Sequence, residues 1–197
     1  MGLRIISGRY KGKKLHSVRG LTIRPTADRL RESIFNILFH GVLNAVVLDL
    51  FAGTGAMGME ALSRGAESAV FVDNNPEALS VIQRNITSCS FDKQARIIKW
   101  DIKENLNCLK LAGTAFDLVF MDPPYNRGMV KPALLNLEQT GFLEKGARIV
   151  VEHSPLEPIP DPVSMFEIAD RRKYGKTLVS FLTYMIRSSI RLPNHRS

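Results

Sequence analysis

The chain has 197 residues, of which 45% are hydrophobic, and this is enough apolar material for one globular domain with its own core. Its formal net charge is +8. Residues 1–31 hold nine basic side chains and one acid, Asp28, so the remainder of the chain is neutral. Such segregation favours contact with a polyanion over a merely solvated basic face.

The same composition excludes several classes of protein. No apolar run approaches the ~20 residues of a membrane span. The two cysteines and four histidines are not spaced as metal ligands or as a disulfide framework. We therefore expect a cytoplasmic protein with no membrane anchor and no bound metal. The sequence shows no coiled-coil heptad, so we expect a monomer.

Residues 1–40 are predicted to form a basic arm that packs on the main domain. Residues 3–8 and 13–18 are expected to pair as a short hairpin. Thr26 is expected to cap the helix that follows. Apolar residues recur at helical spacing in that helix, at Leu30, Ile34, Ile37 and Leu38.

Residues 41–187 are predicted to form the main domain, and residues 188–197 a mobile tail. Short apolar strands alternate here with helical segments. The expected strands are residues 46–51, 69–72, 95–100, 116–121, 147–151, 164–169 and 177–186. Only residues 171–176 separate the last two, which indicates a hairpin. The pattern predicts an α/β fold with a mostly parallel, Rossmann-like sheet, an antiparallel last strand, and ligands at the carboxyl ends of the strands.

A glycine-rich turn follows the first expected strand and precedes a helix. Gly53, Gly55 and Gly58 allow close approach of the backbone to a ligand. Asp73 ends the second strand, where a carboxylate suits ribose hydroxyls. This spacing also fits a nicotinamide-dependent oxidoreductase, or a turn with a purely structural role.

Asp101 follows the third expected strand. Its carboxylate could accept a hydrogen bond from an adenine amino group. With Glu104 it also makes a capping box for a following helix, and both interpretations stay open.

The fourth expected strand delivers Asp122-Pro123-Pro124-Tyr125 at the same edge of the sheet. A base amino nitrogen is a poor nucleophile because its lone pair is delocalised into the ring. Asp122 and the carbonyl of Pro123 can each accept one amino hydrogen and so direct that lone pair toward a methyl donor. Tyr125 offers a face on which an extracted base can stack.

With these residues in view, the sequence resembles the amino-methylating class I methyltransferases, and more narrowly the RsmD-type bacterial 16S rRNA guanine-N2 methyltransferases. The resemblance covers nearly the whole chain. It is carried by residues 4–8 (RIISG), 24–29 (RPTADR), 31–33 (RES), 35–38 (FNIL), 48–65 and 122–125 (DPPY).

The resemblance implies a seven-stranded sheet with an N-terminal basic hairpin, and S-adenosyl-L-methionine as cofactor. The implied cofactor residues are Asp49, Phe51, Gly53, Thr54, Gly55, Asp73, Asn74 and Asp101. The implied catalytic residues are Asp122, Pro123 and Tyr125, with Pro124 beside the base. We expect RNA contacts from Arg9, Lys11, Lys13, Lys14, Arg24, Arg29 and Arg31. Residues 171–175 either touch RNA or form a plain solvated turn.

The function so predicted is methyl transfer to the N2 amino group of a guanine in 16S rRNA, the family target being guanine 966. The expected partner is 16S rRNA or the assembling small ribosomal subunit. Four alternatives remain: an N6-adenine methyltransferase acting on DNA or RNA, a methyltransferase of a protein side-chain amide, a nicotinamide-dependent oxidoreductase, and an RNA-binding module without catalysis.

Overall fold

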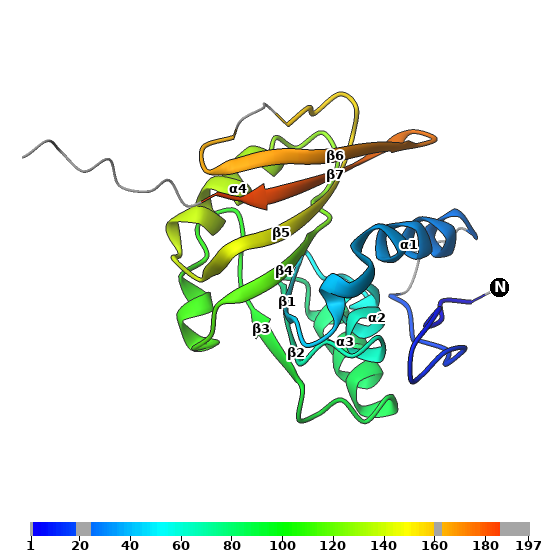
Figure 1. The fold of residues 1–197 in the computed structure, drawn as a ribbon. Helices are drawn as coiled ribbons and strands as arrows, with labels where there is room; N and C mark the ends of the chain where they lie inside the picture. Colours follow the sequence, from blue (N-terminus) through cyan, green and yellow to red (C-terminus); the bar gives the residue numbers. More distant parts are fainter. Residues whose placement is uncertain (1, 19–24, 160–162, 186–197) are drawn as a thin grey trace, which may run out of the picture.

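The structure is a computed structural model that describes residues 2–18, 25–159 and 163–185. Seven strands form one sheet in the order β3-β2-β1-β4-β5-β7-β6 (Figure 1). The strands are β1 (Val46–Leu50), β2 (Ser68–Asp73), β3 (Ala95–Lys99), β4 (Phe116–Met121), β5 (Leu143–His153), β6 (Phe166–Tyr174) and β7 (Thr177–Tyr184). The pairs from β3 to β5 are parallel, and β7 runs antiparallel to both β5 and β6. The predicted fold class is confirmed.

Helices cover both faces of the sheet. One face packs against α1 (Pro25–Leu38), α2 (Ala56–Ser63) and α3 (Pro76–Ser88), and the other against α4 (Val130–Gln139) and the short 3-10 helix η2 (Asn107–Leu111) (Figure 1). A second 3-10 helix, η1 (Phe39–Val42), links α1 to β1. Because side chains alternate along a strand, Phe120 of β4 belongs to the first core and Met121 to the second. No helix in the described ranges combines the length and apolarity that crossing a membrane requires.

The N-terminal hairpin forms and packs on α2. Ile5 donates to the Lys13 carbonyl at 2.9 Å, and Arg4 pairs with Lys14 as an antiparallel bridge. Gly8, at φ +80°, lies so close to α2 that an added Cβ would come within 1.9 Å of the Ser63 carbonyl oxygen. Only glycine fits this contact.

Glu60 of α2 is the main anchor of this hairpin. Its side chain is fully buried and accepts the backbone N–H groups of Ile6 at 2.7 Å and Ser7 at 3.0 Å. Arg64 donates to the same carboxylate at 2.7 Å, and the Arg31 Nε lies 3.8 Å from it. A buried carboxylate with this many partners ties the arm to the main domain.

Asn85 of α3 provides a second connection. Its buried amide accepts the His16 N–H at 2.7 Å and donates to the carbonyls of His16 at 3.1 Å and Thr54 at 3.0 Å. The arm, α3 and the glycine-rich turn are therefore joined through one side chain.

Three local predictions need correction. The first helix begins at Pro25, which suits its first turn, so Thr26 lies inside that turn and not before it. The last two strands reach Tyr174 and restart at Thr177, so the expected six-residue connection is a two-residue turn. The predicted tail, residues 188–197, lies outside the described residues.

No α-helix follows Asp101, which is the third correction. Its carboxylate accepts the N–H of Lys103 at 3.0 Å, two residues on, and a turn follows. Asn105 makes the same local bond to Asn107 at 3.0 Å. Short polar side chains that bond to their own neighbouring backbone compete with helix formation, and here they leave only η2.

Candidate active site

The glycine-rich turn after β1 has a tightly constrained backbone. Gly55 donates to the Ala52 carbonyl at 2.7 Å. Phe51 has φ +58°, a strained conformation for a bulky residue and one that concentrates at functional sites. A Cβ at Gly58 would come within 2.3 Å of the Phe71 ring. The missing side chain therefore lets α2 pack directly on the sheet.

Asp49 is a buried carboxylate of β1, close to this turn. Its Oδ2 accepts the Gly58 N–H at 3.0 Å. Burial raises the pKa of Asp49 to about 7; the nearby charge of Asp73 adds to this effect and the Gly58 hydrogen bond opposes it. Asp49 also lines a cavity, where a cationic ligand would favour its ionised form.

Asp73 organises the same turn from the end of β2. Its Oδ2 accepts the Gly53 N–H and its Oδ1 accepts the Asn75 N–H, both at 2.8 Å. Asn74, between them, is exposed. Gly53 is part of the cavity wall, so Asp73 helps to hold that wall in place through this hydrogen bond. The ribose contact expected of Asp73 and Asn74 stays a prediction.

The Asp122–Tyr125 motif faces this turn across one cavity of about 720 Å³. The motif follows β4, the parallel neighbour of β1, so both segments leave the sheet at the same edge. Asp122, Tyr125, Gly53 and Thr54 all line the cavity, whereas Pro123 is buried beneath the motif and Pro124 is exposed. The structure therefore brings together the two segments that the sequence singled out.

The exposed surface of Asp122 faces this cavity, whose walls limit its hydration. Desolvation raises the pKa of Asp122 well above its ordinary value, and the carboxylates of Glu152 and Asp49 raise it further. Burial also raises the pKa of Glu152. Three acids with raised proton affinity thus share one cavity.

Glu152 was missed by the reasoning from sequence. The Tyr125 hydroxyl donates to its Oε1 at 2.5 Å and lies 3.1 Å from the Thr177 Oγ1. Burial and the Glu152 hydrogen bond raise the pKa of Tyr125, so its hydroxyl remains protonated. Glu152 follows Val151 directly, and Val151 closes an expected strand. The rule that placed Asp122 at the strand end could have found Glu152 too.

Segments far apart in the sequence line the same cavity. Arg31 and Ile34 of α1 contribute to it, and so does Lys176 of the turn between β6 and β7. The Ser33 Oγ and the Tyr174 hydroxyl lie 2.5 Å apart, so a hydrogen bond joins α1 to β6. The cavity is therefore enclosed by elements far apart in sequence.

Comparison with known proteins identifies the family of this chain. The sequence profile of the family described as "Conserved hypothetical protein 95" matches residues 3–183. The chain belongs to this family. Among its relatives, Ribosomal RNA small subunit methyltransferase D of Escherichia coli K12 is 35% identical over 158 residues, which are 80% of this chain and 78% of the relative.

Two further comparisons extend over more of the chain. YlbH of Bacillus subtilis is 35% identical over 178 residues, covering 90% of this chain and 97% of the relative. The solved structure of yhhF from Escherichia coli is 29% identical, covers 93% of this chain and 98% of its own, and superposes with a TM-score of 0.80. The resemblance to RsmD-type methyltransferases, and the class I methyltransferase fold, are thereby confirmed.

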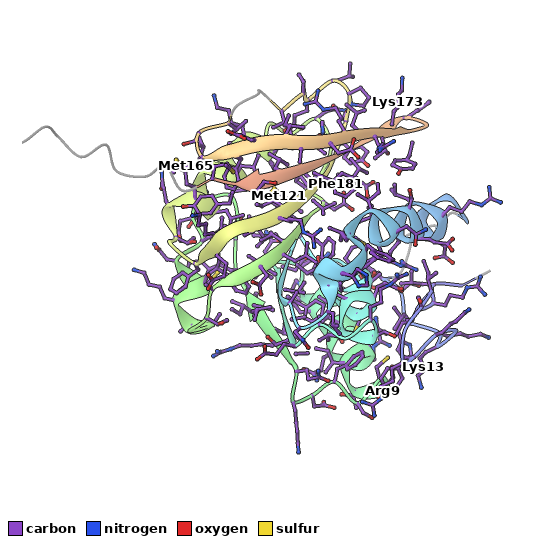
Figure 2. The ribbon with its side chains drawn as sticks, in the orientation of Figure 1. Arg9, Lys13, Met121, Met165, Lys173 and Phe181 are labelled. Atoms are coloured by element: carbon purple, nitrogen blue, oxygen red, sulfur yellow. The ribbon has the colours of Figure 1, made fainter. Side chains whose placement is uncertain are left out.

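In this RsmD-type chain, most of the basic residues predicted to contact RNA are exposed. They are Arg9, Lys11, Lys13, Lys14 and Arg29. Figure 2 shows Arg9 and Lys13 on the N-terminal arm, and Lys173 near the tip of the β6–β7 hairpin. Arg24 lies outside the described residues. Exposed cations therefore lie on both the arm and the β6–β7 hairpin.

Arg31 differs from the other basic residues of the arm. It is 5% exposed, and its guanidinium donates to the Arg4 carbonyl at 2.7 Å and to Asp28 at 2.9 Å. Burial lowers the pKa of Arg31, which the charges of Glu60 and Asp28 oppose. Its contacts hold the arm against α2, and it also lines the cavity, so its contact with RNA stays a prediction.

Asp101 is a predicted cofactor residue that does not line the cavity. It is exposed, and its carboxylate is engaged with the Lys103 N–H. Of its two proposed roles, the local backbone contact is present, in a turn and not in a helix. Its contact with adenine stays a prediction.

Proposed function

We propose that this protein transfers a methyl group from S-adenosyl-L-methionine to the N2 amino group of a guanine in small-subunit ribosomal RNA. The observation that carries the proposal is the shared cavity of the glycine-rich turn and the Asp122–Tyr125 motif. Membership of a methyltransferase family supports the reaction type.

The charge of the cavity favours this cofactor over a dinucleotide. Three carboxylates, Asp49, Asp122 and Glu152, line the cavity against two cations, Arg31 and Lys176. A sulfonium and an amino group would relieve the repulsion among these carboxylates, whereas the two phosphates of NAD would increase it. The cofactor residues we propose are Asp49, Phe51, Gly53, Thr54, Gly55, Asp73 and Asn74.

When bound, S-adenosyl-L-methionine supplies an electrophilic methyl group on a positively charged sulfur. Asp122 accepts one hydrogen of the amino group and the Pro123 carbonyl the other, so the nitrogen lone pair points toward that methyl. Tyr125 stacks on the base. The proton that the nitrogen loses when it takes up the methyl group would pass to Asp122 or to water.

Ribosomal RNA is the proposed substrate because of the relatives and the exposed arm. The Escherichia coli relative is named for small-subunit ribosomal RNA. Folded RNA supplies much of its own specificity by shape, so a small basic arm suffices to position it. Guanine 966 is our expected target. Adenine-N6 in DNA or RNA is the second candidate, because Asp122 serves either amino group.

The test is to incubate the purified protein with labelled S-adenosyl-L-methionine and, separately, with 16S rRNA, partly assembled small subunits and duplex DNA. We expect labelled N2-methylguanosine from an RNA substrate, identified by mass spectrometry of the nucleosides. Labelled N6-methyladenine would overturn the acceptor. Absence of product from all three substrates would contradict the reaction itself.

A further inference from the structure

We propose that Glu152 selects guanine by accepting the hydrogen of its N1. This inference rests on the proposed function, because it names how the same cavity recognises the base. Asp122 alone distinguishes guanine from adenine poorly, since both bases present an amino group to it. A second acceptor beside Asp122 supplies the missing discrimination.

Asp122 and Glu152 occupy equivalent positions on neighbouring strands. Met121 and Val151 are partners in the parallel register of β4 and β5, and each carboxylate belongs to the next residue. Phe120 and Val150, one residue before that pair, line the cavity together with both acids. Side chains alternate along a strand, so both carboxylates lie on the cavity side, about 4.8 Å apart at the backbone.

Two adjacent carboxylates suit two adjacent N–H donors. The N2 amino group and the N1–H of guanine are neighbours on its Watson–Crick edge, the edge by which extracted bases are read. Adenine presents its amino group beside an N1 that carries a lone pair and no hydrogen. An ionised carboxylate only accepts hydrogen bonds, so Glu152 would attract guanine N1–H and repel adenine N1.

The contacts of Glu152 leave it able to serve a ligand. The Tyr125 hydroxyl donates to Oε1 and is itself positioned by Thr177. This contact fixes the carboxylate and leaves Oε2 as an acceptor. A competing role exists, because Glu152 could act only by holding the ring of Tyr125 in place. The test must separate reading of the base from support of that ring.

The experiment compares guanine with 2-aminopurine at the target position, which is mapped first with the natural RNA. 2-Aminopurine keeps the amino group but has a bare N1. For the natural protein we expect kcat/KM to fall about 10-fold or more on this replacement. In Glu152→Gln, kcat/KM for guanine should fall by a similar factor. The kcat/KM for 2-aminopurine should fall less or rise, because the amide N–H of the new glutamine can donate to N1 of that base.

Tyr125→Phe is the matched control, because it keeps the ring and removes only the hydroxyl that contacts Glu152. Its kcat/KM should change for both bases in parallel, with the preference for guanine retained. The loss of O6 in 2-aminopurine affects every variant and cancels in the comparison. Thermal unfolding and cofactor titration of Glu152→Gln check that fold and cofactor site are intact.

The outcomes distinguish the inference from the function on which it rests. An equal guanine preference in the natural protein and Glu152→Gln would overturn the role of Glu152 while leaving guanine methylation standing. If the natural protein methylates no guanine in any RNA, the proposed function itself is wrong.

Discussion

The proposed methyl transfer depends on the side chain of Asp122 more than on that of any other residue. Replacing it with alanine removes an acceptor from the reacting amino group, so we expect methyl transfer to slow by ~10²-fold or more. Cofactor affinity should change little. Single-turnover rates and cofactor titration measure the two effects separately.

Asp117 offers a matched control for this substitution. It lies at the other end of β4, where its carboxylate accepts the Val46 N–H at 2.8 Å, and it is exposed. Asp117→Asn should leave the rate near that of the natural protein. Near-normal turnover of Asp122→Ala would refute the proposed mechanism.

Asp49 should make the stability of the ligand-free protein depend on pH. Its pKa is about 7 in the folded protein against an ordinary value of 3.8, so between these values the folded state holds a proton that the unfolded state has lost. The free energy of unfolding therefore falls as pH rises from about 4 to 7 and is level above that range. Asp49→Asn cannot ionise and should escape this loss, gaining roughly 2–4 kcal/mol relative to the natural protein between pH 4 and 8.

Urea unfolding of both proteins across this pH range measures the effect. The comparison isolates Asp49 from the other cavity acids, which both proteins share. The isosteric amide keeps an oxygen for the Gly58 N–H. Parallel curves for the two proteins would show that Asp49 is not the source of the pH dependence.

The sequence predicted the individual site residues unevenly. Residues 122–125 and the glycine-rich turn were found because order along the chain fixes which strand ends share an edge. Glu152 was missed because a lone acid after a strand has no distinctive neighbours. The buried roles of Glu60 and Asn85 depend on which segments pack together, and local sequence carries no such information.

Among the elements, the contact between α2 and the arm depends most on one buried group. Glu60→Ala would leave Arg31, which is 5% exposed, with a buried charge that has lost a partner. We expect a loss of about 3–5 kcal/mol in the free energy of unfolding. The arm should also become sensitive to trypsin at Arg9 and Lys11.

Denaturant unfolding and limited proteolysis measure these two consequences. Glu67→Ala serves as control, because Glu67 is exposed and follows the same helix. A stability loss without cleavage of the arm would mean that Glu60 stabilises α2 alone. Unchanged stability would contradict the role given to this carboxylate.

Element boundaries were predicted less well than element order. The hairpin was recognised from the two segments of strand-like composition, but residues 171–174, three of them charged, were assigned to the connection between them. In the structure these residues extend β6 beyond the core, where one face of a strand meets water and charge is tolerated. The helix expected after Asp101 is absent because the residue types that cap helices also form turns.

At the scale of the whole molecule, the concentration of basic residues in the N-terminal arm should govern the affinity for RNA. Replacing Arg9, Lys11, Lys13 and Lys14 with glutamine should weaken binding to 16S rRNA. It should also flatten the dependence of log K on log salt concentration by about 0.7 to 0.9 per lost phosphate contact. Filter binding at several salt concentrations measures the slope.

A second fourfold variant, with Lys93, Lys99, Lys103 and Lys110 replaced, removes the same charge near the β3 edge of the sheet. These residues are also exposed. This variant should keep the slope of the natural protein. Equal slopes for all three proteins would show that the arm is a solvated surface that makes no contact with RNA.

The overall architecture was the most predictable level. The alternation of strands and helices predicted the mostly parallel sheet, and the connection between the last two strands, too short for a crossover, predicted the antiparallel β7. How the arm sits against the sheet was not predictable, because it depends on Gly8 meeting Ser63 and on one buried carboxylate.

The hydrogen bond between Ser33 and Tyr174 joins an early segment of the chain to a late one, and this has a consequence for synthesis of the protein on the ribosome. During translation, the α1 residues that line the cavity emerge from the ribosome early, whereas residues 174–177 emerge after all the other residues that line it. A nascent chain can therefore complete its glycine-rich turn and first four strands before the cavity is enclosed. The site that we propose for the base is complete only with the final strand pair, so incomplete translation products lack it even when most of the sheet has formed.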